Sequence, residues 1–400
     1  MTVVVERPHV VFVGHVARLS GGELALLRTL PALLPYLTVT VVLAEDGPLV
    51  GALTALGVRV VVLPLADAVR NTRRSQVTRV PLGQAWTLAA YVLRLARLLR
   101  SLDADLVHTN TLKAALYGGL AGRLARLPVV WHVRDRIAAD YLPGPAVAAV
   151  RGLAWLLPSA MIANSQATLA TLPSGRRWGG LAASVVPNAL VPDNVVRPEL
   201  SPPGRGEVFT VGVVGRLSPW KGQQVFLAAV AQAFPDRCVR ARLIGSAMFG
   251  EDAFEEALRE QVRDLGLTET VEFRGFRDDV WAELAELDLA VHCSTLPEPF
   301  GQVVLEAMAA GVAIIASAEG GPAEIITHGV DGWLVAPRDA AALAVALRTL
   351  AEDEQLRARL AAGGQCTAAT YTAERTAAGI LAVYASVRGR SARRRPSSNR

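Results

Sequence analysis

Residues 210–222 read TVGVVGRLSPWKG. A run of β-branched and small apolar residues leads through a glycine into a short basic loop, and an apolar stretch of helical length follows from Gln223. A strand that turns through glycine into a helix is the opening half of a βαβ unit. The same order recurs along most of the chain, so we predict an α/β fold with parallel sheets.

The predicted strands form two series, one in each half of the chain. In the first half they lie at residues 10–13, 38–43, 59–63, 105–108, 129–132 and 160–163. In the second half they lie at residues 210–214, 240–244, 270–273, 289–292, 313–316 and 333–335. Residues 191–207, which are rich in proline and glycine, separate the two series and indicate a domain boundary.

We therefore predict two doubly wound, Rossmann-like domains, with ligands at the carboxyl ends of their strands. The N-terminal domain is expected to span residues 1–195 and the C-terminal domain residues 196–371. A final helix over residues 372–387 can pack on either domain, and we assign it to the N-terminal one. Residues 388–400 hold six arginines without apolar anchors and are predicted to form a disordered basic tail.

Charge is divided unevenly between the two halves. Residues 1–195 hold 19 Lys and Arg against 10 Asp and Glu, whereas residues 196–387 hold 16 against 26. We expect a basic face on the first domain. No helix-turn-helix, zinc-finger or aromatic-basic sheet motif accompanies it, so we predict no nucleic-acid partner.

An apolar content of 52% requires that a membrane protein be considered. The longest apolar runs are interrupted within about 20 residues by Arg94, Arg151 or Glu306, which is too early to span a bilayer. The N-terminus lacks the basic-then-apolar order of a secretory signal. The three cysteines are far apart and in no CxxC pair, which indicates neither a disulfide framework nor a thiolate metal site. We therefore expect a cytoplasmic protein.

The loop that follows the strand at residues 210–214 can bind an anion. Gly215 lets the backbone approach a ligand, and Arg216 and Lys221 supply two cations before a helix begins. Two cations beside a helix N-terminus can hold a diphosphate. A solvated basic loop is the alternative interpretation.

A second stretch, residues 298–311, reads EPFGQVVLEAMAAG. The prolines on either side of Glu298 keep the segment extended up to a helix that we expect to begin near Gly301. Glu306 lies in the second turn of that helix, so the two carboxylates can reach different parts of one extended ligand. The alternatives are a helix-dipole partner at Glu298 and a solvated helix face at Glu306. The apolar neighbours of Glu306 favour a functional role.

Together these stretches resemble the retaining glycosyltransferase family 4. The E-x7-E pattern of Glu298 and Glu306, the upstream GRLSPWKG and the downstream GGPAEI at residues 320–325 stand in the family's order and spacing. Residues 273–276 (FRGF) match more weakly, and Asn188 is followed by alanine where the family usually has glycine. The resemblance covers nearly the whole chain. It implies a GT-B fold, in which two Rossmann-like domains face each other across a cleft.

The resemblance also implies a function and roles for C-terminal residues. The enzyme would transfer a sugar from a nucleotide-diphosphate sugar, based on UDP or GDP, to an acceptor hydroxyl. Arg216, Lys221 and Glu298 would be catalytic, because the two cations would bind the diphosphate and stabilise the departing nucleotide while the carboxylate holds the sugar. Glu306 would accept hydrogen bonds from the ribose. Further donor-binding positions would be Gly215, Phe276, Phe300 and Gly301.

In the N-terminal, acceptor-side domain, Gly21 and Gly22 resemble the family's glycine loop near the diphosphate. A simple strand-to-helix turn is the alternative. His132 stands at the end of a predicted strand and resembles the family's cleft histidine near the transferred sugar, so we count it as a fourth catalytic residue.

The chemistry of transfer needs positive charge at the leaving group, because cleavage of an anomeric C–O bond leaves extra negative charge on the diphosphate. The resemblance implies front-face attack with retention, in which the leaving phosphate takes the acceptor's proton and no protein base is required. The nucleotide-sugar is then a co-substrate, and we expect no cofactor.

We also predict no metal. Asp103 and Asp105 form the DxD pattern of a metal-dependent fold, but they precede a strand, at the edge where ligands are not expected, and we interpret them as a surface turn. The six histidines show no zinc spacing.

Arginines gather in one loop and one helix of the N-terminal half. These arginines are Arg70, Arg73, Arg74, Arg79, Arg94, Arg97 and Arg100. The helical ones lie beside an apolar stripe and can hold an anionic membrane surface. We predict peripheral contact with the inner membrane face and an acceptor that is anionic or lipid-linked, such as a cell-surface glycan precursor. A solvated arginine edge on a helix whose leucines are core is the alternative.

Two other functions fit parts of the pattern. A nucleotide-sugar epimerase of the same fold would need acid and base groups placed across the sugar ring. A non-catalytic sugar-nucleotide-binding protein would be expected to have lost Glu298, Arg216 or Lys221, and the chain keeps all three.

Overall fold

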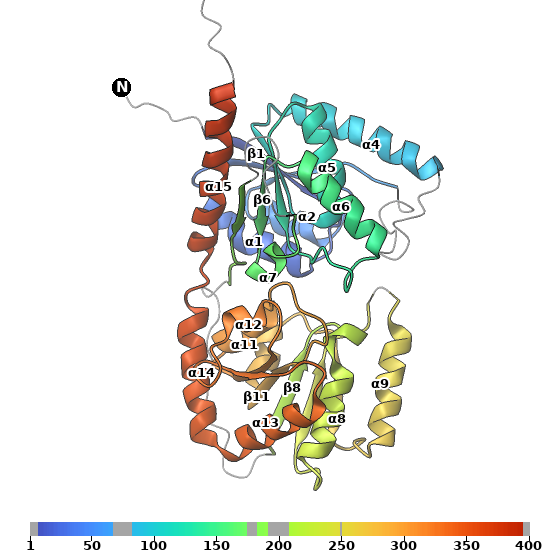
Figure 1. The fold of residues 1–400 in the computed structure, drawn as a ribbon, viewed down its shortest axis with the longest axis vertical. Helices are drawn as coiled ribbons and strands as arrows, with labels where there is room; N and C mark the ends of the chain where they lie inside the picture. The colour runs from blue at the N-terminus through green and yellow to red at the C-terminus, as the bar shows by residue number, and fades with distance from the viewer. Residues whose placement is uncertain (1–6, 67–81, 174–181, 191–207, 249, 395–400) are drawn as a thin grey trace, which may run out of the picture. The chain divides into compact units, whose positions relative to one another are not determined.

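The computed structural model describes residues 7–66, 82–173, 182–190, 208–248 and 250–394. The chain separates into two compact units (Figure 1). Unit 1 consists of Met1–Ala189 with Ala373–Arg400, and unit 2 consists of Leu190–Thr372. Each unit is built on one parallel sheet.

Unit 1 holds a seven-stranded sheet in the order β3-β2-β1-β4-β5-β6-β7, and every pairing is parallel. The chain starts in the middle, runs to one edge and then returns past its start, so the direction of winding reverses between β1 and β4. The strands are β1 (His9–Gly14), β2 (Thr38–Leu43), β3 (Arg59–Val62), β4 (Leu106–Thr109), β5 (Val129–Val133), β6 (Ala160–Ala163) and β7 (Ala182–Val185).

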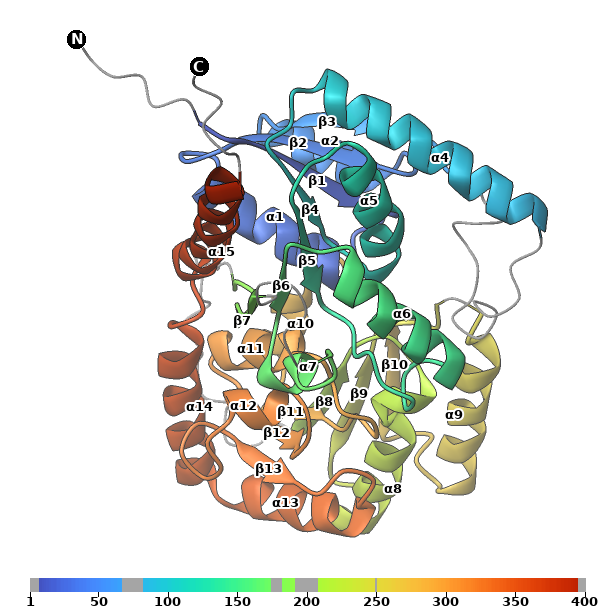
Figure 2. The same cartoon turned by 45° about the horizontal axis from the view of Figure 1, so that its top comes forward.

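Helices cover both faces of this sheet because successive strand residues point to opposite sides. Val11 and Val13 of β1 pack into a core with α4, α5 and α6, whereas Val10 and Phe12 pack into a second core with α1, α2 and α15 (Figure 2). The helices are α1 (Gly21–Leu33), α2 (Pro48–Ala55), α4 (Leu82–Ser101), α5 (Leu112–Leu124), α6 (Gly144–Leu156), α7 (Gln166–Leu169) and α15 (Ala373–Arg394).

Unit 2 repeats the plan with six parallel strands in the order β10-β9-β8-β11-β12-β13. Winding reverses between β8 and β11. The strands are β8 (Thr210–Val214), β9 (Arg240–Ile244), β10 (Val271–Gly275), β11 (Leu289–His292), β12 (Ala313–Ser317) and β13 (Trp333–Val335). The helices are η2 (Pro219–Lys221), α8 (Gln223–Ala233), α9 (Asp252–Asp264), α10 (Val280–Ala285), α11 (Gln302–Ala309), α12 (Pro322–Ile325), α13 (Ala340–Glu352) and α14 (Glu354–Ala368).

The two faces of the unit 2 sheet are covered in the same way. Leu289 and Val291 of β11 pack with α8, α9 and α13, while Ala290 packs with α10, α11 and α12. Uninterrupted apolar runs such as LAV at residues 289–291 are expected for strands buried on both faces.

The C-terminal helix returns to unit 1. Ala377, Ile380 and Tyr384 of α15 are buried in the core that contains Val10 and Phe12. The helix runs to Arg394, so the predicted disordered tail is wrong for residues 388–394; residues 395–400 lie outside the described part. Arginine is a good helix former, and the single glycine at position 389 costs only about 1 kcal/mol, so the helix continues through residues 388–394.

The sequence did not predict β7, a short strand that pairs in parallel with β6. In the middle of the same sheet, at the amino ends of β1 and β4, the backbone N–H of His9 donates to Oδ2 of Asp105 at 2.8 Å. No helix in the described part of the chain is long and apolar enough to cross a membrane.

Candidate active site

Two loops of unit 2 meet where its winding reverses. The loop after β8 leads through η2 to Lys221, and the loop after β11 leads to Glu298 just before α11. Because β8 and β11 pair directly, their carboxyl ends lie side by side, and the loops that follow them are neighbours. Residues 77 positions apart in the sequence are therefore brought into contact.

The backbone of these loops approaches so closely that Gly222 must be glycine. Its φ is +79°, and a Cβ there would lie 1.9 Å from the carbonyl oxygen of Cys293. The Cys293 thiol donates to the Gly222 carbonyl at 3.2 Å, and the Thr295 amide donates to the Trp220 carbonyl at 2.8 Å. Burial raises the pKa of Cys293 to about 12, so the thiol stays protonated as a donor. The two loops thus form one rigid support.

Glu298 is the centre of the polar cluster on this support. The Lys221 ammonium donates to both of its carboxylate oxygens, at 2.8 Å to Oε1 and 2.7 Å to Oε2. Oε2 also accepts from Nε2 of His292 at 2.8 Å and from the Ser294 hydroxyl at 2.9 Å. The side chains of Lys221 and Glu298 are only 15% and 12% exposed, so the ion pair is largely withdrawn from water.

This surrounding keeps the carboxylate ionised. Burial by itself raises the pKa of Glu298, but the adjacent Lys221 ammonium and His292 outweigh it and hold the pKa well below its usual range. A carboxylate that accepts several charge-assisted hydrogen bonds is a fixed negative charge.

The loop that follows β12, at Gly320 and Gly321, packs closely against the backbone of Glu298. The Gly321 amide donates to the Glu298 carbonyl at 2.8 Å. A Cβ on Gly320 would lie 2.3 Å from that same carbonyl oxygen, and one on Gly321 would lie 2.1 Å from the carbonyl oxygen of Phe300. The glycine pair of the GGPAEI stretch is therefore required by the EPFG stretch that it packs against.

The structure places Arg216 beside a different carboxylate. Its Nε lies 3.5 Å from Oε2 of Glu251, and both side chains are about a quarter exposed. The Gly215 amide donates to the Ile244 carbonyl at 2.9 Å, so this N–H is already engaged within the sheet. Of the two predicted cations, Lys221 is the one that contacts Glu298.

The remaining predicted donor-binding residues lie on or near α11 and after β10. Glu306 is buried within α11, at 7% exposure. Gly301 is the N-cap of that helix, and the Phe300 ring is buried against Tyr371 with ring centroids 6.1 Å apart. Phe276, by contrast, is 63% exposed.

Unit 1 has a second polar cluster at its own reversal point. Gly21 and Gly22 begin α1 after β1, and Asn110 follows β4. The Asn110 amide group donates to the Gly22 carbonyl at 2.9 Å, and its Oδ1 accepts from Nε of Arg134 at 3.2 Å. Arg134 also donates through Nη1 to Oδ1 of Asn188.

His132 lies one residue before the end of β5, inside this cluster, and is 2% exposed. Its Nδ1 lies 3.2 Å from Nε2 of His108 and 3.4 Å from Nη2 of Arg134. Burial, with the positive charge of Arg134, keeps the pKa of His132 well below its usual range and lowers that of His108 to about 3. Both rings are neutral at physiological pH.

Arg134, His108 and Asn110 were not predicted as site residues. Arg134 stands two positions after His132 in the stretch WHVRD, which is the one signal that could have identified it. Glu23, the third residue of α1, is also buried; burial raises its pKa despite a hydrogen bond from Ser20 and the charge of Arg134.

The arginines predicted to touch acceptor or membrane divide into two groups. Arg70, Arg73 and Arg74 lie outside the described residues. Arg94 and Arg97 are exposed on α4. The same helix buries the apolar residues Tyr91, Val92, Leu95 and Leu99 and exposes the large apolar side chains of Trp86, at 78%, and Leu93, at 48%.

Two family models match the chain. The one described as Glycosyl transferases group 1 matches residues 201–366, and the one described as Glycosyltransferase Family 4 matches residues 49–193. The D-inositol 3-phosphate glycosyltransferase of Corynebacterium glutamicum is 34% identical over 180 residues, 44% of this chain and 42% of that enzyme. The lipopolysaccharide core biosynthesis glycosyltransferase LpsD of Rhizobium meliloti is 33% identical over 45% of this chain and 50% of that protein. The matches thus span half or less of these curated relatives.

Solved structures match over a larger part of the chain. Anabaena Alr3699/HepE, crystallised in complex with UDP-glucose, is 31% identical with a TM-score of 0.80, covering 94% of this chain and 99% of that one. The sucrose-phosphate synthase of Thermosynechococcus elongatus, at 20% identity and a TM-score of 0.73, covers 96% of this chain and 100% of that one and shares the fold alone. The predicted fold class of two doubly wound α/β domains is confirmed.

We expect Gly222→Ala to destabilise unit 2 far more than Gly266→Ala. Both glycines have left-handed φ, +79° and +64°, but a Cβ on Gly266 meets nothing within 4 Å. The control should cost about 1–2 kcal/mol of backbone strain, and Gly222→Ala should cost more because the new methyl overlaps the Cys293 carbonyl. Denaturant unfolding measures both; equal losses would contradict the close approach of the loops.

We expect Glu298→Gln to destabilise the protein in a pH-dependent way. The folded pKa of Glu298 lies below its unfolded value of about 4.3, so its contribution is present above that pH and is lost as the pH falls below it. The difference in unfolding free energy between wild type and variant should be about 2–4 kcal/mol at pH 7 and should shrink below pH 4.

The control for this pH dependence is Glu256→Gln, which removes a carboxylate that is 64% exposed and 3.7 Å from Arg263. It should change stability by less than about 1 kcal/mol at any pH. A Glu298→Gln difference that stayed constant from pH 7 to pH 3 would contradict the ionised, paired state of the carboxylate.

Proposed function

Because the chain belongs to glycosyltransferase family 4, we propose that it transfers a sugar from a nucleotide-diphosphate sugar to an acceptor hydroxyl. The observation that carries the proposal is the Lys221–Glu298 cluster at the reversal point of unit 2, where a doubly wound sheet binds its ligands. A UDP-sugar is the favoured donor, since the HepE complex holds UDP-glucose.

In this proposal Lys221 binds the donor diphosphate. An ammonium group has three N–H donors, and two of them serve the Glu298 oxygens, which leaves one for a phosphate oxygen. Glu298 holds Lys221 in place and accepts from a sugar hydroxyl with its remaining capacity. Arg216 supplies the second cation by turning from Glu251 to the phosphate, an exchange that its partial exposure permits.

The other donor contacts follow from position. The amides of Phe300 and Gly301 lie at the N-terminus of α11, where the helix dipole favours electron-rich oxygens. Glu306 accepts from the ribose hydroxyls, and the exposed ring of Phe276 is free to stack on the base. The amide of Gly215 already donates to the Ile244 carbonyl, so Gly215 contributes by lacking a side chain, which lets the donor approach the backbone.

In unit 1 we assign Gly21 and Gly22, at the N-terminus of α1, to the diphosphate, and His132 to a hydroxyl of the transferred sugar. The Nε2 atom of His132 is buried without a hydrogen-bond partner in the described part of the chain, and a buried imidazole N–H favours a polar ligand.

The proposed reaction retains the anomeric configuration and uses no metal. The cations at the diphosphate stabilise the leaving group, whose phosphate oxygen takes the proton of the attacking hydroxyl. The ionised Glu298 already accepts from three donor groups and has a pKa held below its usual range, which makes it a poor base and suits it to holding a partner in place.

For the acceptor we propose an anionic or lipid-linked hydroxyl compound, reached by peripheral binding of α4 to the inner membrane face. Trp86 and Leu93 give the helix an exposed apolar side, and Arg94 and Arg97 lie next to it. An exposed tryptophan beside arginines is typical of helices that lie in a membrane interface.

The first test is to incubate the protein with UDP-, GDP- and dTDP-sugars and to measure release of the nucleotide diphosphate. Slow release from one donor without formation of an epimer is expected for a transferase. Epimer formation would support the alternative enzyme, and tight binding without turnover would support a non-catalytic binder.

With the active donor, Lys221→Ala should lower kcat by about 100- to 1000-fold, because removing one preorganised donor at the leaving group costs about 2.7–4 kcal/mol of transition-state stabilisation. Arg263→Ala, an exposed arginine of α9 in the same unit, is the matched control and should be neutral. Unchanged turnover in Lys221→Ala would remove the proposed role.

For the membrane part, we expect co-sedimentation with vesicles of phosphatidylglycerol and phosphatidylcholine at low salt. Changing Arg94 and Arg97 together to Gln should weaken binding about tenfold or more, because each basic residue near an anionic surface contributes about 1 kcal/mol. The same change of Arg259 and Arg263 on α9 is the charge-matched control. Failure of the wild type to bind at low salt would end this part of the proposal.

A further inference from the structure

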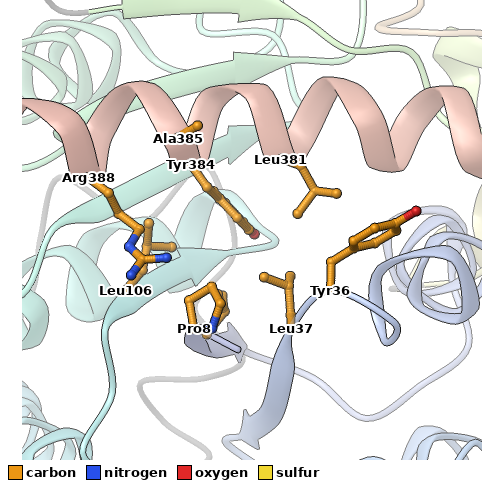
Figure 3. A pocket seen from close by; sticks show the side chains of 9 residues that line it. Pro8, Tyr36, Leu37, Leu106, Leu381, Tyr384, Ala385 and Arg388 are labelled. Carbon is orange, nitrogen blue, oxygen red and sulfur yellow. The ribbon is translucent and has the colours of Figure 1, made fainter. Parts of the chain in front are cut away.

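A continuous chain of hydrogen-bonding groups runs from α15 to His132. The Tyr384 hydroxyl lies 2.6 Å from Nδ1 of His108, and Nε2 of His108 lies 3.2 Å from Nδ1 of His132. Tyr384 projects from α15 toward the strand that carries Leu106 (Figure 3). His108 is two residues further along this strand and therefore faces the same side.

The direction of the protons in this chain follows from its two ends. Arg134 can only donate, so its contact with Nδ1 of His132 favours the tautomer in which Nδ1 accepts and Nε2 carries the proton of the neutral ring. At the other end, a phenol is a strong donor and a weak acceptor, so the 2.6 Å contact has Tyr384 donating to Nδ1 of His108. His108 then carries its proton on Nε2 and donates it to His132.

We infer that Arg134 and Tyr384 are positioning residues that act from opposite ends to hold His132 in the tautomer with its proton on Nε2. That Nε2 atom is buried and unpartnered among the described residues, so the network leaves one N–H donor for a ligand. The inference rests on the proposed function only in naming a sugar hydroxyl as the group that accepts from it.

The surroundings make the hydroxyl of Tyr384 decisive. His108 is 1% exposed and its ring lies against Phe12 with centroids 4.5 Å apart, so among the described residues the Tyr384 hydroxyl is the group that holds its Nδ1 atom. A cavity of about 140 Å³ borders Tyr384 (Figure 3). Its lining includes Pro8, Leu37, Leu106, Leu381, Tyr384 and Arg388. With open space on one side, packing alone holds the ring less firmly, and the hydrogen bond to His108 supplies the constraint.

The test is the tautomer of each histidine, read from the ¹⁵N shifts of the full chain labelled in its six histidines. His132→Asn and His108→Asn assign the signals. We expect both rings in wild type to be neutral and protonated on Nε2. Tyr384→Phe should shift the nitrogens of His108 and His132 toward a mixture of tautomers, and Tyr117→Phe should leave both unchanged. Tyr117 is a matched control because its buried hydroxyl donates to the Gly14 carbonyl at 3.1 Å.

A wild-type His132 protonated on Nδ1, or shifts that Tyr384→Phe does not move, would overturn the inference. Should Tyr384→Phe not fold, Arg134→Met tests the other end with the same readout. With an active donor, Tyr384→Phe should lower kcat/KM by about 3- to 10-fold, the range expected for one hydrogen bond. The spectra are recorded without a sugar donor, so they test the tautomers independently of activity. If the tautomers are as inferred but the protein turns over no nucleotide-sugar, only the proposed function is contradicted.

Discussion

The ion pair between Lys221 and Glu298 is the interaction on which the unit 2 site depends. Moving a carboxylate out of water costs several kcal/mol unless a cation and further donors compensate, and here Lys221, His292 and Ser294 do so together. The pair can form only because the loops after β8 and β11 touch along their backbones. The glycines at 222, 320 and 321, which admit no Cβ, therefore serve this one contact.

Most of the fold follows from short-range patterns, and the exceptions have local causes. The runs of β-branched and apolar residues at 38–43, 210–214 and 289–292 coincide with β2, β8 and β11, because strands buried on both faces of a parallel sheet are rich in such residues. Strand β7 has the sequence AASV, which carries one β-branched residue, and only its pairing with β6 makes it a strand. The extension of α15 to Arg394 likewise has a local cause, the helix propensity of its arginines. The prediction of disorder there rests on the lack of apolar residues.

The site residues also divide into those that local motifs identify and those that only the fold brings together. Sequence motifs name Lys221 and Glu298 because their spacing to glycines and prolines is local, but the contact between them depends on strand order, which no local pattern contains. Tyr384 and His108 are 276 positions apart, and each by itself is an ordinary aromatic in an apolar helix or strand. The sequence likewise predicts that Gly215 lets the backbone approach a ligand but does not reveal that its amide donates to the Ile244 carbonyl, a bond that depends on the neighbouring strand.

The two units place their polar groups by the same topology yet give them opposite electrostatics. In unit 2 opposite charges are paired, which suits a ligand that brings phosphate charge. In unit 1 the histidines are neutral, and Arg134 helps to keep them so, because its positive charge opposes a second one nearby. The guanidinium is itself held by the amide oxygens of Asn110 and Asn188. A cation is thus used there to preserve an uncharged donor, which is the form of imidazole that can bind a hydroxyl without the cost of burying another charge.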